Sequence, residues 1–261
     1  MDTVYRGVAA AALASFRLMR WDVRATAVEH IPRRGPAIIA ANHIGYLDFA
    51  FIGAGARLRG RLVRFLARHE AFEHWLGGPL MRAMRHIPVD REGEAAAALD
   101  ASLRALEEGE VIGIHPEGAI SRSYVTQPGK TGAARLSISS GAPLIPAAVW
   151  GSHRILAPGR RPRLPRDVVI TVEYGEPMFP AAEEDPAGLT ERLMQRVGRM
   201  VERAAAAYPQ RPRQGEDRWW IPTHLGGSAP TVEESLAMTS RDAERRRARR
   251  ALERESGSSS R

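Results

Sequence analysis

Short apolar segments alternate with longer helix-like stretches from residue 37 to residue 174 of this chain. Short uninterrupted apolar segments are typical of strands that are buried on both faces of a sheet. Strands that alternate with helices favour parallel connections between successive strands, so we predict an α/β fold with a mostly parallel central sheet flanked by helices. The predicted strands are residues 37–41, 63–65, 87–89, 111–114, 144–149 and 168–174. The first predicted helix begins near residue 46, and the other three cover residues 75–84, 94–108 and 131–140.

Composition excludes several classes of protein. The chain has 261 residues and no cysteine, which removes thiol nucleophiles, thiolate metal centres and disulfide frameworks. The apolar fraction of 44% and the charged fraction of 26% are those of an ordinary folded domain. A chain of this length buries enough surface to be stable without a disulfide or a structural metal. The six histidines other than His43 and His115 lack the spacing of metal ligands, such as H-E-x-x-H. No metal and no cofactor are therefore predicted.

The positive charge favours an anionic partner. There are 38 basic and 30 acidic residues, for a net charge of +8, and all the basic residues except Lys130 are arginines. Phosphate-bearing substrates, nucleic acid and an acidic membrane surface all fit this balance. The aromatic residues form no recognisable nucleic-acid fingerprint, so no nucleic-acid partner is predicted.

The two ends of the chain differ from its middle. Residues 8–16 are apolar but far shorter than the roughly 20 residues of a membrane-spanning helix. We expect residues 1–25 to form an amphipathic helix, which either docks on a membrane or packs on the core. Residues 26–208 form the predicted catalytic domain, and residues 209–261 a polar, arginine-rich extension that is partly disordered.

A histidine and an aspartate follow the first predicted strand. His43 and Asp48 are five positions apart, which on one continuous helix would separate them by about 140°. The two side chains meet only if His43 lies in the turn after the strand and Asp48 reaches back from the first turns of the helix. A histidine held by a carboxylate on one ring nitrogen can act as a general base with the other. The alternative from spacing alone is a structural histidine.

Four short motifs carry a family resemblance. The segment Asn42-His43 with Asp48 resembles the N-H-x-x-x-x-D box of the glycerolipid acyltransferases, the family of the 1-acylglycerol-3-phosphate acyltransferases. Residues 87–91 (IPVDR), 115–118 (HPEG) and 142–146 (APLIP) resemble the second, third and fourth boxes of that family, in the same order. Together the four boxes span about residues 37–150.

The resemblance implies a single-domain glycerol-3-phosphate acyltransferase-like fold and an O-acyltransferase activity. Such an enzyme moves a fatty acyl chain from acyl-CoA or acyl carrier protein to the hydroxyl of a lysophospholipid. The first choice of acceptor is 1-acylglycerol-3-phosphate, which would give phosphatidic acid. A different lipid acceptor, or a non-catalytic module that binds anions or membranes, stays open as an alternative. No G-x-S-x-G elbow is present, so direct transfer is expected rather than a covalent acyl-enzyme.

The resemblance also assigns roles to residues. His43 is the expected general base, Asp48 the residue that fixes its tautomer, and Asn42 a neighbouring substrate-binding residue. The acceptor phosphate is expected to meet Arg91 and Arg122, whose planar forks bind phosphate, although Arg91 could instead form a surface pair with Asp90.

Three further residues complete the expected binding site. Glu117 would accept a hydrogen bond from the acceptor hydroxyl or hold an arginine, with a helix-capping role as its alternative. Gly118 would let the backbone approach the ligand, and Lys130 would contact the phosphates of the donor. His115 is either a second titrating group or a structural ring. A lipid acceptor further implies a cytoplasmic enzyme that associates peripherally with the anionic inner face of the cell membrane.

Overall fold

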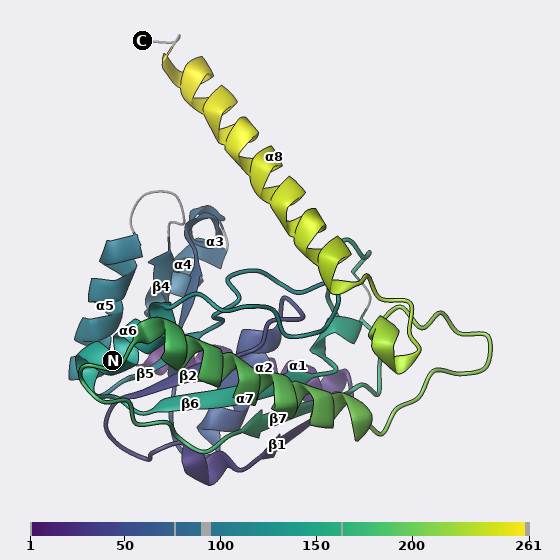
Figure 1. Cartoon of the computed structure of the whole chain (residues 1–261), viewed down its shortest axis with the longest axis horizontal. Helices are drawn as coiled ribbons and strands as arrows, with labels where there is room; N and C mark the ends of the chain where they lie inside the picture. Colours follow the sequence, from purple (N-terminus) through teal and green to yellow (C-terminus); the bar gives the residue numbers. More distant parts are fainter. Residues whose placement is uncertain (1, 76, 90–94, 163, 259–261) are drawn as a thin grey trace. The chain divides into compact units, whose positions relative to one another are not determined.

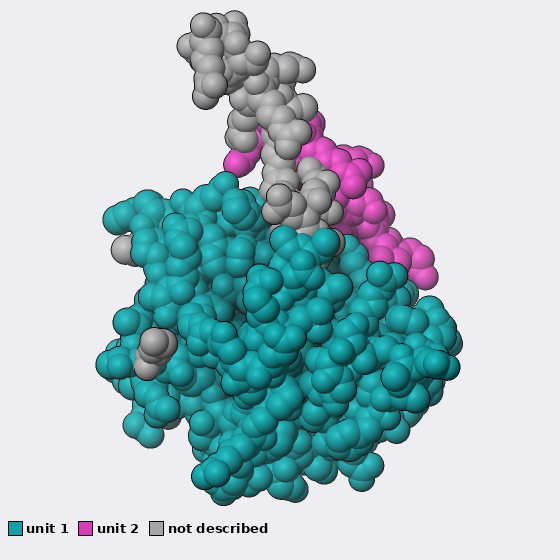
Figure 2. Space-filling view, turned by 90° about the vertical axis from the view of Figure 1, so that its left-hand side faces the viewer, with its two compact units in different colours: residues 1–120, 126–211 teal, residues 121–125, 212–261 magenta. Residues whose placement is uncertain are grey.

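The computed structural model describes residues 2–75, 77–89, 95–162 and 164–258. The chain divides into two compact units, shown in different colours in Figure 2. Residues 1–120 and 126–211 make up the first unit, and residues 121–125 and 212–261 make up the second. The first unit contains the sheet and the predicted general base.

A seven-stranded sheet forms the centre of the first unit (Figure 1). Its strand order is β1-β7-β6-β2-β5-β3-β4, and every neighbouring pair is parallel except β6 and β7. The predicted mostly parallel α/β sheet is therefore confirmed. The strands are β1 (Asp22–Thr26), β2 (Ala37–Ala41), β3 (Val63–Arg68), β4 (Ile87–Val89), β5 (Val111–Ile114), β6 (Leu144–Trp150) and β7 (Val169–Tyr174).

The burial of each strand explains whether the sequence predicted it. Every residue of β2 and β6 is buried, as expected for strands covered by helices on both faces. Pro88 lies in β4, at the edge of the sheet, where a residue without a backbone N–H costs no ladder bond. The helix expected over residues 1–25 is shorter than predicted, because it ends at Leu18 and residues 22–26 form β1. The residues of β1 are alternately exposed and half-buried, and β1 pairs only with β7 at the other edge of the sheet.

Helices connect the parallel strands and pack in two groups. On one side α1 (Thr3–Leu18) contacts α2 (Asp48–Arg57), and on the other α6 (Gly132–Ser140) contacts both α5 (Ala95–Glu107) and α7 (Pro186–Ala206). Between β3 and β4, α4 (Gly77–Ala83) lies within the predicted helix 75–84, and a short helix that the sequence did not predict, α3 (His69–Glu73), precedes it. Short 3-10 helices cover Val28–His30 and Ser152–Arg154.

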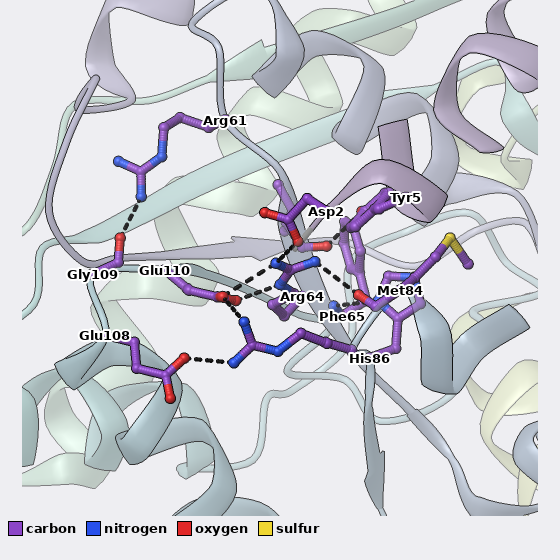
Figure 3. A network of polar contacts seen from close by, with 12 residues as sticks. Asp2, Tyr5, Arg61, Arg64, Phe65, Met84, His86, Glu108, Gly109 and Glu110 are labelled. Atoms are coloured by element: carbon purple, nitrogen blue, oxygen red, sulfur yellow. Dashed lines mark hydrogen bonds and ion pairs between the residues drawn. The ribbon is translucent and has the colours of Figure 1, made fainter. Parts of the chain in front are cut away.

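A buried arginine fastens α1 to the sheet (Figure 3). Arg64 of β3 donates to Asp2 at 2.6 Å, to the carbonyl of Met84 at 2.9 Å and, at the closest contact, to Glu110. Its guanidinium also lies 5.3 Å from the ring centroid of Tyr5, whose hydroxyl donates to the carbonyl of Val63 at 2.7 Å. The start of α1 is thereby tied to β3 by charge, hydrogen bonds and packing.

The second unit contains most of the predicted extension. Its described part includes a 3-10 helix, Thr223–Leu225, and the long helix α8 (Val232–Ser258). Thr231 and Glu234 form a capping box at the start of α8, since each accepts the backbone N–H of the other. In the same unit, the backbone N–H of Arg122 donates to the hydroxyl of the buried Ser235 at 2.9 Å.

Candidate active site

The end of β2 is held in place by an asparagine. The Asn42 side chain donates to the carbonyl of Val149 at 3.0 Å and accepts from the backbone N–H of the same residue at 2.8 Å. The side chain is almost fully buried, so both bonds form away from water. Asn42 thus joins β2 to β6 one residue before His43.

The predicted histidine and aspartate meet. Nδ1 of His43 lies 2.8 Å from Oδ2 of Asp48, and that oxygen also accepts the backbone N–H groups of Ile44, at 2.7 Å, and Gly45, at 2.9 Å. Asp48 is the first residue of α2, so its carboxylate reaches back over the turn, as the spacing required. Because a carboxylate only accepts, Nδ1 of His43 carries the proton and Nε2 is left as the basic nitrogen.

The Asp48 carboxylate is fully buried and remains ionised. Burial opposes its charge, but hydrogen bonds from His43 and Ser152 and the attraction to a positive His43 hold its pKa below the usual value. The Ser152 hydroxyl donates to Oδ1, the oxygen that His43 does not use. The two carboxylate oxygens are therefore both satisfied, while the His43 side chain stays 21% exposed.

Sequence reasoning missed Ser152. It is the second residue after β6, and β6 and β2 are adjacent parallel strands whose ends lie at the same edge of the sheet. A Cβ atom at Gly45 would lie 3.1 Å from the backbone nitrogen of His153, so the His43 turn and the Ser152 segment are in close contact. The signal available in the sequence was the pair Gly151-Ser152 directly after a predicted buried strand.

Glu117 braces the same turn from the next strand. Oε1 accepts the backbone N–H of His43 at 2.9 Å, and Oε2 accepts that of Gln127 at 3.3 Å. Burial raises the pKa of Glu117 to about 8, and the negative charge of Asp48 also raises it. The hydrogen bonds from the two backbone N–H groups lower the pKa but do not offset burial. Glu117 therefore fixes the backbone of the residue proposed as base.

Two other expected residues lie beside Glu117. Gly118 has a φ of +69°, a conformation that favours glycine. A Cβ at this position would lie 3.3 Å from Cε and 3.6 Å from Nζ of Lys130, so the exposed lysine runs alongside the Gly118 backbone. The structure thus brings Lys130 to the loop that carries Glu117.

Of the two expected phosphate-binding arginines, only Arg122 belongs to the described residues. Arg91 lies outside the described residues. Arg122 belongs to the second unit, where its Nη2 donates to Asp242 of α8 at 2.7 Å. The ion pair holds the pKa of Asp242 below its usual value.

Comparison with known proteins agrees with the motifs. The family model described as Acyltransferase matches residues 22–150, which include His43, Asp48 and Glu117. The chain belongs to the glycerolipid acyltransferase family. The resemblance drawn from the four boxes is therefore confirmed, and so is the expectation of an acyltransferase enzyme.

Relatives of this acyltransferase include enzymes named 1-acyl-sn-glycerol-3-phosphate acyltransferase. The one from Bacillus subtilis is 29% identical over 185 residues, which are 69% of this chain and 88% of the relative. The one from Limnanthes douglasii is 31% identical over 153 residues, which are 58% of this chain and 52% of the relative. This chain thus spans about half the length of the plant enzyme.

A solved structure confirms the expected fold. The 1-acyl-sn-glycerophosphate (LPA) acyltransferase from Thermotoga maritima superposes on this acyltransferase with a TM-score of 0.64 and 21% identity. The match covers 78% of this chain and 81% of that one. In the described part of the chain, no group of three or more histidine, aspartate or glutamate residues is arranged to hold a metal ion. Within the same residues, no helix combines the length and apolar character that crossing a membrane requires.

Proposed function

We propose that this acyltransferase moves a fatty acyl chain from acyl-CoA or acyl carrier protein to the hydroxyl of 1-acylglycerol-3-phosphate, giving phosphatidic acid. The observation that supports it most is the contact between His43 and Asp48, which leaves Nε2 of His43 as the unprotonated, basic nitrogen. The names of the Bacillus and Limnanthes relatives support the choice of acceptor. Other lysophospholipids carry the same hydroxyl and phosphate and are the second candidates.

In the proposed reaction, Nε2 of His43 takes the proton of the acceptor hydroxyl as its oxygen attacks the carbonyl carbon of the thioester. A new C–O ester bond forms and the C–S bond breaks. The proton then passes from His43 to the departing sulfur, which leaves as a thiol. Asp48 holds the ring in the required tautomer and stabilises the imidazolium that forms.

The acceptor phosphate requires cations near the His43 turn. Arg91 and Arg122 remain the arginines that the family boxes place in this role, and Asn42, Glu117 and Gly118 shape the backbone around the base. Lys130, which lies alongside Gly118 in the first unit, is instead the proposed contact for the phosphates of the donor. Removal of Arg91 or Arg122 should raise the KM for a phosphate-bearing acceptor more than the KM for the donor.

The test of the proposed reaction uses purified protein with each donor and a panel of lysolipids, and the product is identified by mass spectrometry. We expect phosphatidic acid from 1-acylglycerol-3-phosphate, and a loss of about 10³-fold or more in kcat for His43→Ala and Asp48→Asn. His69→Ala, which changes an exposed histidine of α3, is the control and should keep full activity. A folded His43→Ala variant with more than about a tenth of wild-type kcat would rule out this base.

A lipid acceptor lies in a bilayer, so we also propose that the enzyme is cytoplasmic and docks peripherally on the anionic inner face of the cell membrane. Residues 1–25 are the proposed docking element, and Val4 and Leu18 of α1 have exposed fractions of 50% and 69%. Deletion of α1 would also remove the buried Tyr5 and Phe16, so it is a poor test. The double variant Val4→Asp, Leu18→Asp should reduce flotation with anionic vesicles and keep the fold. Unchanged flotation would place docking elsewhere on the protein.

A further inference from the structure

The ring of His115 stacks on the ring of His43. The two ring centroids are 4.1 Å apart and the planes differ by 10°. The ring of Phe65 follows at 6.3 Å from His115, with an angle of 19°. The sheet order explains the stack, because β5, which ends just before His115, lies between β2, which His43 follows, and β3, which contains Phe65. His115 thus fills the space between the proposed base and the core.

The backbone fixes the orientation of His115. Its Nδ1 lies 3.1 Å from the carbonyl oxygen of Ala41 and 3.0 Å from that of Asn42. Carbonyl oxygens only accept, so Nδ1 carries the proton and Nε2 does not. Ala41 and Asn42 are the two residues before His43, so His115 contacts both the backbone that leads to His43 and the His43 ring itself.

His115 stays neutral in this position. Burial lowers its pKa to about 3, and a positive charge on His43 acts in the same direction, while the charge of Asp48 and the two carbonyl groups oppose it. Its Nε2 is buried and, within the part of the chain that the structure describes, has no hydrogen-bond partner. A neutral ring with no exchangeable proton on its second nitrogen is suited to packing rather than to proton transfer.

We propose that His115 is a positioning residue, which holds the plane of the His43 ring by stacking on it while its own Nδ1 is anchored to the backbone before His43. This inference rests on the proposed role of His43 as the base. Asp48 holds the His43 ring at Nδ1, and His115 covers one face of the same ring. Proton transfer is sensitive to small changes in this geometry.

Three variants separate the two contacts of His115. His115→Ala removes the ring and the donor, His115→Phe keeps a ring without the donor, and His115→Asn keeps an amide donor near Nδ1 without the ring. For His115→Ala we expect kcat to fall about 10- to 100-fold, with the KM of both substrates unchanged within about twofold. His115→Phe should restore kcat to within about fivefold of wild type, and His115→Asn should stay near the alanine value.

Thermal unfolding of each variant shows which ones are folded, and the comparison of the phenylalanine and asparagine variants holds even if His115→Ala does not fold. A phenylalanine variant as slow as the asparagine variant would overturn the stacking role. So would wild-type kcat in His115→Ala while His43→Ala is inactive. Activity retained in His43→Ala would instead refute the proposed base, so the two failures are distinguishable.

A second measurement needs no substrate. Nitrogen-15 NMR of labelled histidines in the wild-type protein reports which ring nitrogen of His115 carries the proton, and the His115→Phe spectrum assigns the signals. We expect a protonated Nδ1, a bare Nε2 and no titration of this ring between pH 5 and pH 8. A proton on Nε2, or a midpoint near the ordinary histidine value, would contradict the proposed anchoring.

Discussion

The hydroxyl of Ser152 donates to Oδ1 of Asp48, while Oδ2 of the same carboxylate receives the imidazole of His43. The two oxygens therefore have different hydrogen-bond partners. Oδ2 holds the proposed base and the turn around it, and Oδ1 is satisfied from a segment 104 residues further along the chain. The position of the base thus depends on the packing of β6 as well as on the local turn.

Ser152→Ala should weaken this arrangement without removing it. The buried Oδ1 would lose its donor, and the free energy of unfolding should fall by about 1–3 kcal/mol. We expect kcat to fall about tenfold as Asp48 becomes less well fixed, which is less than for Asp48→Asn. Urea unfolding and steady-state kinetics measure both effects. Ser140→Ala, which removes a hydroxyl bonded to the carbonyl of Leu136 and to the N–H of Ala142, is the control, and an equal kcat for the two variants would contradict the role of Ser152.

The pKa of Glu117 predicts a stability that depends on pH. From about pH 4.5 to the folded value of about 8, the folded protein holds a proton that the unfolded chain has released. The wild type should therefore lose stability as pH rises through this window, by at most about 1.4 kcal/mol per pH unit.

Glu117→Gln isolates this effect, because glutamine does not titrate. The free energy of unfolding of the wild type minus that of Glu117→Gln should become smaller between pH 5 and pH 8. Denaturant unfolding at several pH values gives this difference, in which the titration of all other groups cancels. A difference that is constant with pH would mean that Glu117 is ionised throughout the window.

Arg64 should contribute far more to stability than an exposed ion pair. Its side chain is 3% exposed, and Arg64→Met would leave Asp2 and Glu110 without their buried partner. We expect a loss of about 3–5 kcal/mol in the free energy of unfolding. Arg203→Met breaks the exposed pair with Glu173 and should cost about 0–1 kcal/mol. Similar losses in urea unfolding for the two variants would show that the network in Figure 3 is not a stabilising anchor.

The ion pair between Arg122 and Asp242 predicts an effect on phosphate recognition. If Arg122 meets the acceptor phosphate, as its place after the third box implies, Asp242 competes for the same guanidinium. Asp242→Asn should then lower the KM for 1-acylglycerol-3-phosphate roughly two- to fivefold, in line with the small free energy of a partly exposed pair.

The matched control is Glu244→Gln, which removes the same charge from an exposed position of α8 two residues away. It should leave the KM unchanged, and the KM of the acyl donor should be unaffected in both variants. Equal effects of the two substitutions would mean that only the net charge of α8 matters. A higher KM in Asp242→Asn would show that Asp242 orients Arg122 rather than competing for it.

Much of the sheet and the central contact of the site follow from local sequence. The buried strands β2, β5 and β6 are predicted because a short, uninterrupted apolar segment is typical of a strand that is buried on both faces of a sheet. The contact of His43 with Asp48 is predictable because both lie in one turn, where five positions of spacing allow a single geometry for contact. For Lys130, the structure adds a position beside Gly118 to the role expected from the sequence.

Contacts between distant segments were decided by the tertiary structure alone. Ser152 reaches Asp48 because β6 pairs with β2, His115 stacks on His43 because β5 lies on the other side of β2, and Arg122 meets Asp242 across 120 residues. The sequence predicts that strands exist but not which ones become neighbours, because strand order is a global compromise among all the helices and strands that must bury their apolar faces. The sequence by itself therefore determined the family, the proposed base and its carboxylate, and the tertiary structure decided which residues hold them in place.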